Sequence, residues 1–271
     1  MIKVAICQMG ASGTAPENIQ KIIRMTEHAV EESKNLDVVC FPEYCYFEPD
    51  QQSAIQIPEP IPGPYTNAMC SLAKRLHVNL IPGSLMTCAD SGKYYNSSVF
   101  INRDGEIIAR YDKIHLMKAL GCDESESVEY GDTPAVFDTD FGRVGLMVCY
   151  DLRFPELARG MVQDGADILF VPSMFPAGEA LPPRTDHWDS LVESTALLNL
   201  TYTVAVNQYG YVANSVPFGR SRVVDPWGTV IAQCSNREDI AYAHIDLDYQ
   251  KKVRCGVASW ENRRPEVYTL R

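Results

Sequence analysis

The chain has 271 residues, of which 46% are hydrophobic and 22% are charged, and its formal net charge is −11. This composition is typical of a folded globular protein and excludes a disordered chain. The negative charge argues against nucleic acid or an anionic membrane as a partner, because both attract basic surfaces.

The predicted elements begin with a strand, a helix and a second strand. Residues 2–9 form an apolar strand candidate. A helix is expected to begin near Thr14, because Thr14 can cap it, Pro16 suits its first turn and Glu17 completes a capping box. The apolar run at residues 36–40 predicts a second, buried strand.

Hairpins are expected to follow. The dipeptide Asp104-Gly105 is a strong turn signal between two apolar runs. The predicted middle elements are a strand at 79–86, a hairpin of 95–102 and 106–113, an antiparallel pair at 135–138 and 143–149, a helix near 154–163 and a strand at 167–172.

The last third of the chain continues the alternation. Its predicted elements are a helix near 189–199, a strand at 201–207, a hairpin of 221–225 and 229–233, a strand at 240–245 and a short helix at 249–253. This pattern is typical of an α/β protein with mixed sheets. Because no linker or composition break divides it, we expect one domain over residues 1–271.

The stretch RVGLMVCYDLRFPELARGM, residues 143–161, places Cys149 between a buried strand and an amphipathic helix. Backbone N–H groups at such a turn favour a thiolate and a developing oxyanion. A small buried side chain at a strand end is the structural alternative. A nucleophilic cysteine also needs a base, and His115 and His187 are conceivable bases without a recognisable local signature.

Two further polar residues fall at the ends of predicted strands. Glu43 follows the run at 36–40 and can act as a base if a dry pocket raises its pKa. Lys113 ends the second strand of the first hairpin. An exposed loop carboxylate and a solvated lysine are the structural alternatives. Together with Cys149, these residues predict one shared site at the strand ends.

Three stretches around these residues closely resemble the signature segments of the carbon-nitrogen hydrolase, or nitrilase, superfamily. They are FPEY, YDKIHL and GLMVCYDLRFPE, in the family's order. The resemblance extends over nearly the whole chain and is to the family's amidase branch. It implies a four-layer α-β-β-α sandwich with two mixed β-sheets. It also implies a homodimer or a higher homo-oligomer, in which dimers form through the helix after Cys149 and the C-terminal strand or tail.

The resemblance also implies a role for each matching residue. Glu43 would be the general base, Lys113 the electrostatic stabiliser of the tetrahedral intermediate and Cys149 the nucleophile. Glu124 matches the family's second glutamate and would position Lys113 or the substrate nitrogen, with Glu126 and Glu129 as neighbouring alternatives. No metal and no organic cofactor is expected. Cys45, two residues after Glu43, is then expected to be structural.

Substrate-binding residues are expected close to Cys149. The backbone N–H of Tyr150 would share the oxyanion with Lys113. Arg153 and Arg184 could each hold a substrate carboxylate as a bidentate fork, with an ordinary salt bridge as the alternative. Phe175 and Arg184 belong to residues 172–188, which resemble the family's substrate loop.

The stretch YDLRFPE resembles small-amide hydrolases of the omega-amidase type, so a small linear amide, in particular the ω-amide of a carboxylic acid, is the favoured substrate. N-carbamoyl compounds are the second expectation and nitriles the third. Both stay open because the family hydrolyses all three substrate classes with the same four residues. A non-catalytic binding member of the fold is disfavoured, since Glu43, Lys113 and Cys149 are all present.

The remaining expectations concern compartment and thiol chemistry. No apolar stretch is long enough for a transmembrane helix, and the strand-like start MIKVAI does not read as a signal peptide, so we expect a cytoplasmic protein. The nine cysteines are scattered without a C-x-x-C pair. This spacing favours reduced thiols over a disulfide framework, a metal site or a redox centre.

Overall fold

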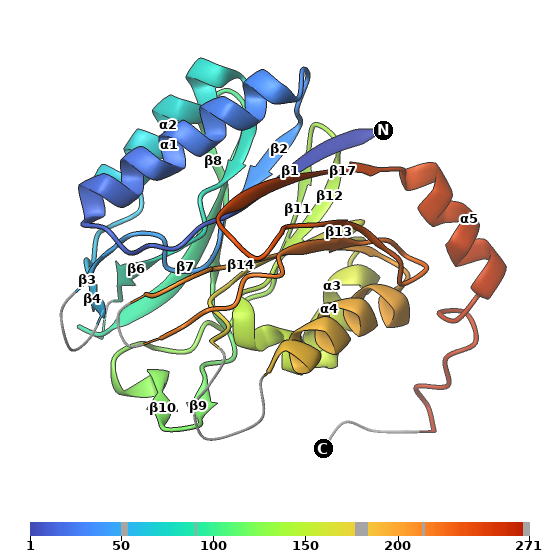
Figure 1. Cartoon of the computed structure of the whole chain (residues 1–271). Helices are drawn as coiled ribbons and strands as arrows, with labels where there is room; N and C mark the ends of the chain where they lie inside the picture. Colours follow the sequence, from blue (N-terminus) through green and yellow to red (C-terminus); the bar gives the residue numbers. More distant parts are fainter. Residues whose placement is uncertain (50–53, 90, 177–183, 213–214, 268–271) are drawn as a thin grey trace.

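The computed structural model describes residues 1–49, 54–89, 91–176, 184–212 and 215–267. Two mixed β-sheets face each other, and helices cover the outer side of each sheet (Figure 1). The expected four-layer α-β-β-α sandwich is therefore confirmed.

The first sheet has seven strands. They are β1 (Ile2–Gln8), β2 (Val38–Cys40), β5 (Asn79–Ile81), β6 (Ser84–Cys88), β7 (Tyr94–Ile101), β8 (Ile107–Asp112) and β17 (Asp239–Ile245). Their order is β17-β1-β2-β5-β7-β6, and β8 also pairs with β7. β1, β2 and β5 run parallel, whereas the other pairings are antiparallel.

The second sheet has six strands in the order β11-β12-β13-β14-β15-β16. They are β11 (Ala135–Thr139), β12 (Gly142–Leu146), β13 (Ile168–Ser173), β14 (Tyr202–Asn207), β15 (Arg222–Val224) and β16 (Val230–Gln233). The central strands β12, β13 and β14 are parallel. Their carboxyl ends therefore meet at one edge, where polar side chains can gather.

Helices and short elements complete the layers. The helices α1 (Ala15–Glu32) and α2 (Pro64–Leu76) lie together over the first sheet, and α3 (Pro155–Gln163) and α4 (Thr185–Asn199) lie together under the second (Figure 1). The remaining elements are β3 (Phe47–Pro49), β4 (Ala54–Gln56), β9 (Lys118–Ala119), β10 (Cys122–Asp123), the 3₁₀ turns η1 (Glu124–Glu126) and η2 (Cys149–Arg153), and α5 (Leu247–Val257).

The alternation along β1 explains how one sheet serves two cores. Val4 and Ile6 belong to the apolar cluster that also contains residues of the second sheet, whereas Ala5 and Cys7 belong to the cluster with α1 and α2. Successive strand residues point to opposite faces, so a strand that is apolar throughout can be buried on both sides. All four side chains are 0% exposed, as a middle layer requires.

Most of the predicted elements are present, including the helix that begins after Thr14, the hairpin around Asp104-Gly105 and the antiparallel pair in residues 135–146. The strand expected at 79–86 is instead two strands, β5 and β6, because Pro82 has no N–H to continue the ladder and Gly83 has a left-handed φ of +84°. The helix α2 was not predicted, and α4 begins four residues before its predicted start. No helix in the described part of the chain is long and apolar enough to span a membrane.

The break at Gly83 yields a testable prediction about stability. A Cβ at Gly83 would lie 1.9 Å from the Pro42 carbonyl oxygen, next to Glu43, whereas a Cβ at Gly92, with a similar φ of +83°, would meet no described atom within 4 Å. Gly83→Ala should therefore lower the free energy of unfolding by about 2 to 4 kcal/mol more than Gly92→Ala does. Urea denaturation of both variants measures this difference, and equal losses would contradict it.

Candidate active site

Glu43 follows β2 of the first sheet but is anchored to the second sheet. Its backbone N–H donates to the Ser173 carbonyl at the end of β13 over 3.3 Å. The Gln208 side chain, directly after β14, donates to the carbonyl oxygens of Glu43 and Tyr44 at 2.7 and 3.0 Å. These bonds place the Glu43 side chain between the two sheets, where it is 2% exposed.

Three donors hold the Glu43 carboxylate. Its Oε1 accepts from Asn96 Nδ2 at 2.8 Å and from Lys113 Nζ at 2.9 Å, and its Oε2 accepts from the Met174 backbone N–H at 2.9 Å. Burial raises the pKa of Glu43, and the Lys113 ammonium offsets part of this increase. A carboxylate with a raised pKa is better matched to accept a proton from a thiol than an exposed one is.

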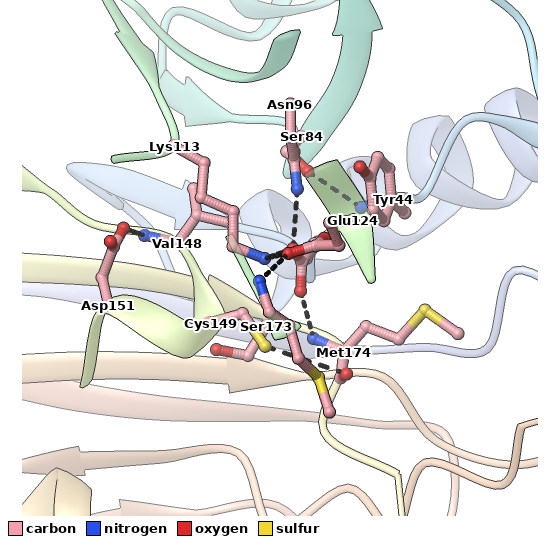
Figure 2. A network of polar contacts seen from close by, with 12 residues as sticks. Tyr44, Ser84, Asn96, Lys113, Glu124, Val148, Cys149, Asp151, Ser173 and Met174 are labelled. Atoms are coloured by element: carbon pink, nitrogen blue, oxygen red, sulfur yellow. Dashed lines mark hydrogen bonds and ion pairs between the residues drawn. The ribbon is translucent and has the colours of Figure 1, made fainter. Parts of the chain in front are cut away.

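The Lys113 ammonium, directly after β8, bridges two carboxylates. Besides Glu43 it contacts both oxygens of Glu124, at 3.0 and 2.8 Å, and Figure 2 shows Lys113 pointing toward Glu124. The Lys113 side chain is 1% exposed. Burial opposes its charge, but Glu43 and Glu124 outweigh burial and raise the pKa of Lys113 well above its usual value. The ammonium is therefore a fixed positive charge.

Glu124 lies at the start of η1, after the short β9–β10 hairpin. Its Oε2 accepts a hydrogen bond from the Met117 backbone N–H at 2.6 Å, which aims the carboxylate at Lys113. Of the neighbouring glutamates, Glu129 pairs instead with Lys93 at 3.7 Å. Within the described residues, Glu124 is thus the glutamate of this segment that contacts Lys113.

Cys149 begins η2, three residues beyond the end of β12, and is 5% exposed. Its φ of 49° is left-handed, which is uncommon for a residue with a Cβ and marks a tight, strained turn. The Sγ atom lies 3.8 Å from the Met174 carbonyl oxygen (Figure 2). The Met174 peptide therefore contacts both groups, since its N–H binds Glu43 and its carbonyl faces the thiol.

The expectation of a stabilised thiolate at Cys149 is wrong for the resting protein. Burial raises the pKa of Cys149 well above its usual value, and the neighbouring Glu43 carboxylate raises it further. Because the thiol is neutral at rest, it needs a base to become a nucleophile. Glu43 is the group that interacts with it directly.

Asp151, which was not predicted as a site residue, fixes the turn that carries Cys149. Its fully buried carboxylate accepts from the Val148 backbone N–H at 2.8 Å, from the Tyr111 hydroxyl at 2.7 Å and from the His115 backbone N–H at 3.0 Å. These bonds join the residues on both sides of Cys149 to the end of β8. An Asp two residues after a candidate nucleophile was the signal available for this role.

The two candidate histidine bases are engaged elsewhere. His115 Nδ1 lies 2.8 Å from Asp151 Oδ1, and its ring stacks on Phe154 with centroids 3.7 Å apart. His187 Nδ1 lies 3.5 Å from Arg153 Nη2. Neither histidine hydrogen-bonds Cys149 in the described part of the chain.

A cavity of about 460 Å³ lies beside η2, the turn that begins with Cys149, because Tyr150 and Arg153 of this turn line it. It is lined by Met117, Ala119, Leu120, Tyr150, Arg153, Arg184 and His187. The Arg153 guanidinium lies 5.5 Å and that of Arg184 4.9 Å from the centre of the Phe175 ring. The four residues expected to bind substrate, Tyr150, Arg153, Phe175 and Arg184, therefore lie together, whereas residues 177–183 of the expected substrate loop lie outside the described residues.

Arg184 is a buried cation without a carboxylate partner among the described residues. It is 5% exposed, and its Nε donates to the Pro176 carbonyl at 3.1 Å. Burial lowers the pKa of Arg184, although the nearby Cys149 has the opposite effect. A buried guanidinium that no described carboxylate neutralises is suited to receive an anionic group from outside.

Cys45 is buried like Cys149, but it differs in its partner, because a side-chain hydrogen bond links Glu43 to Cys149. It is 0% exposed, and its thiol donates to the Pro42 carbonyl at 3.1 Å. Burial raises its pKa. All nine cysteines are free thiols.

The bridge at Lys113 predicts a large effect on stability. Lys113→Met should lower the free energy of unfolding by about 3 to 5 kcal/mol, because the Glu43 and Glu124 carboxylates lose their buried counterion. Adding Glu124→Gln should restore part of this loss, since it removes one of the two negative charges. Denaturant titration near neutral pH provides the comparison, and a Lys113→Met protein as stable as the parent would rule out the bridge as a stabilising element.

Comparison with known proteins confirms the resemblance. A nitrilase and fragile histidine triad fusion protein of Caenorhabditis elegans is 34% identical over 98% of this chain, which spans 62% of that protein's length. The omega-amidase NIT2 of Homo sapiens is 31% identical, over 99% of this chain and 97% of its own length. The crystal structure of the carbon-nitrogen hydrolase from Helicobacter pylori G27 has a TM-score of 0.88 at 27% identity, over 98% of this chain and 96% of that one.

The sequence model of the carbon-nitrogen hydrolase family matches residues 3–254, which include Glu43, Lys113, Glu124 and Cys149. With this match and the relatives above 30% identity over nearly the full chain, the protein belongs to the carbon-nitrogen hydrolase family.

Proposed function

We propose that the protein is an amidase that hydrolyses the C–N bond of a small linear amide, in particular the ω-amide of a carboxylic acid, to the acid and ammonia. The observation that carries this proposal is the convergence of Glu43 and Lys113 on the Cys149 thiol. Membership of the carbon-nitrogen hydrolase family supports the bond type, and the omega-amidase relative supports the substrate class.

In the first half of the reaction Cys149 becomes acylated. Glu43 takes the thiol proton as the sulfur attacks the amide carbonyl carbon. The oxygen that gains the negative charge is stabilised by the Lys113 ammonium and the Tyr150 backbone N–H. When the C–N bond breaks, Glu43 returns the proton to the leaving nitrogen, so that ammonia departs and a thioester remains.

In the second half water releases the acid. Glu43, again ionised, takes a proton from water as its oxygen attacks the thioester carbon. The C–S bond then breaks, and the proton on Glu43 returns to the Cys149 sulfur, which restores the resting state. Glu124 holds Lys113 throughout and needs no change of protonation.

The cavity favours an amide with a distal carboxylate. Arg184 is buried without an acidic partner in the described chain, and Arg153 lies beside the same aromatic ring. The apolar side chains of Met117 and Leu120 line the same cavity as Arg153 and Arg184, and they suit a short aliphatic chain in the substrate. N-carbamoyl compounds, and then nitriles, remain the alternative substrates, because the chemistry at Cys149 accepts them equally.

We further propose a homodimer. Large apolar side chains at the end of α4, in the β15–β16 turn and in α5 are exposed: Leu197 is 48%, Trp227 is 59% and Val257 is 41% exposed. Trp227 and Val257 line one hollow, and Gly228 lies against Leu197. A second copy would cover this patch.

The free thiols support a reducing compartment, and we propose a cytoplasmic protein folded as one domain.

A pair of cysteine variants tests the nucleophile. Cys149→Ala should abolish ammonia release from every accepted amide, because no thioester can form. Cys45→Ala should keep most of the turnover, since this buried thiol only donates to the Pro42 carbonyl. Ammonia is measured against short amides, ω-amides of dicarboxylic acids, N-carbamoyl amines and nitriles. Unchanged activity in Cys149→Ala would refute the mechanism, and a profile restricted to nitriles would refute the substrate.

A substitution of Arg184 tests the distal carboxylate. Arg184→Met should raise KM for the ω-amide of a dicarboxylic acid at least about tenfold, the effect of losing a charge-assisted hydrogen bond. A neutral amide of the same chain length serves as the control, and its KM should change little. Equal effects on both substrates would show that Arg184 does not bind the carboxylate.

A further inference from the structure

We propose that Asn96 is a positioning residue for the general base: it occupies Oε1 of Glu43 together with Lys113, so that Oε2 is the oxygen that accepts the proton of Cys149. This inference rests on the proposed role of Glu43 and adds the residue that assigns different tasks to its two oxygens. Asn96 is the third residue of β7 and is 0% exposed.

The donors around the carboxylate are distributed unequally. Oε1 accepts from Asn96 Nδ2 at 2.8 Å and from Lys113 Nζ at 2.9 Å. Oε2 accepts from the Met174 N–H at 2.9 Å. A carboxylate oxygen offers two lone-pair directions. Both directions at Oε1 are therefore in use, whereas Oε2 keeps one for the thiol proton.

The position of the thiol agrees with this assignment. Cys149 Sγ lies 3.8 Å from the carbonyl oxygen of Met174, the residue whose N–H binds Oε2. Figure 2 shows Cys149 beside Met174, with Asn96 approaching the network from the opposite side. The thiol and the Asn96 amide thus reach the carboxylate from different directions.

The hydrogen bond to Glu43 is the one that the Asn96 side chain makes in the described structure. Its Oδ1 is buried without a hydrogen-bond partner in the described structure, which is an unfavourable arrangement for a core residue. Its Nδ2 makes the bond to Glu43, and its backbone carbonyl accepts from the Lys113 N–H at 2.9 Å. One residue of β7 therefore holds both the base and the cation that shares Oε1.

A substitution of Asn96 should change the pKa of Glu43, which the surrounding titratable groups also influence. The titratable groups that act electrostatically on or with Glu43 are Lys113, Glu124, Cys149, Tyr44, Cys45 and Cys122. A hydrogen bond to the ionised form lowers the pKa of a carboxyl group. Loss of the Asn96 bond therefore raises the pKa of Glu43, and activity that needs ionised Glu43 is lost at a higher pH.

The test measures the pH dependence of Asn96→Ala and of Asn96→Leu, which keeps the number and branching of the side-chain heavy atoms. The acidic limb of kcat/KM should move up by about one pH unit, the shift expected for one hydrogen bond to a charged group, and kcat should fall while KM stays nearly constant. Ser98→Ala is the matched control, because Ser98 is also fully buried on the same face of β7 and donates instead to the Gly83 carbonyl. Its profile should coincide with that of the parent.

A second readout requires no substrate. Alkylation of Cys149 by iodoacetamide, followed by mass spectrometry with the exposed Cys255 as the internal reference, reports the same proton transfer. The acidic limb of the alkylation rate should move to higher pH in Asn96→Ala and Asn96→Leu. In Ser98→Ala it should stay where it is in the parent. Limbs that coincide with the parent's would overturn the role of Asn96. A shifted alkylation limb without turnover of any amide would leave that role intact and refute the proposed function.

Discussion

The active site depends on the charge balance around one buried ammonium. Lys113 is 1% exposed and lies within 3.0 Å of two carboxylates, Glu43 and Glu124. Without this cation the Glu43 carboxylate would be buried beside Glu124 with no counterion, which favours its protonated form, and Glu43 could not then fill its proposed role as a base. Because the positive charge is fixed before any substrate arrives, it is also available to stabilise an oxyanion without reorganisation.

The fold brings this cluster together by facing two sheets toward each other. Glu43 and Lys113 follow strands of the first sheet, whereas Cys149 follows a strand of the second. The connection between them is backbone: the Met174 peptide binds Glu43 through its N–H and faces the thiol through its carbonyl. Met174, directly after β13, therefore links the proposed base to the proposed nucleophile, and Asn96 donates to the Glu43 carboxylate at its other oxygen.

The sequence predicted those features that arise from local rules. The capping box at Thr14 and Glu17, the Asp104-Gly105 turn and the strand ends at Glu43, Lys113 and Cys149 each have a signal within a few residues. Asn96, Asp151 and Gln208 were not predicted, because their partners lie 53, 36 and 165 residues away along the chain. The strained turn raised a further difficulty: backbone N–H groups near Cys149 suggested a thiolate, but burial, which only the packed structure reveals, raises the pKa of the thiol.

The central claim is that hydrolysis passes through an acyl thioester on Cys149. The protein is mixed with the p-nitrophenyl ester of the acid that an ω-amide yields, because this activated ester makes acylation faster than deacylation. The reaction is quenched with acid during the first turnover. Peptide mass spectrometry then locates the acyl group. The account predicts one acyl group per chain, on the peptide that contains Cys149. Turnover that leaves Cys149 unmodified, or that places the acyl group on another cysteine, would contradict it.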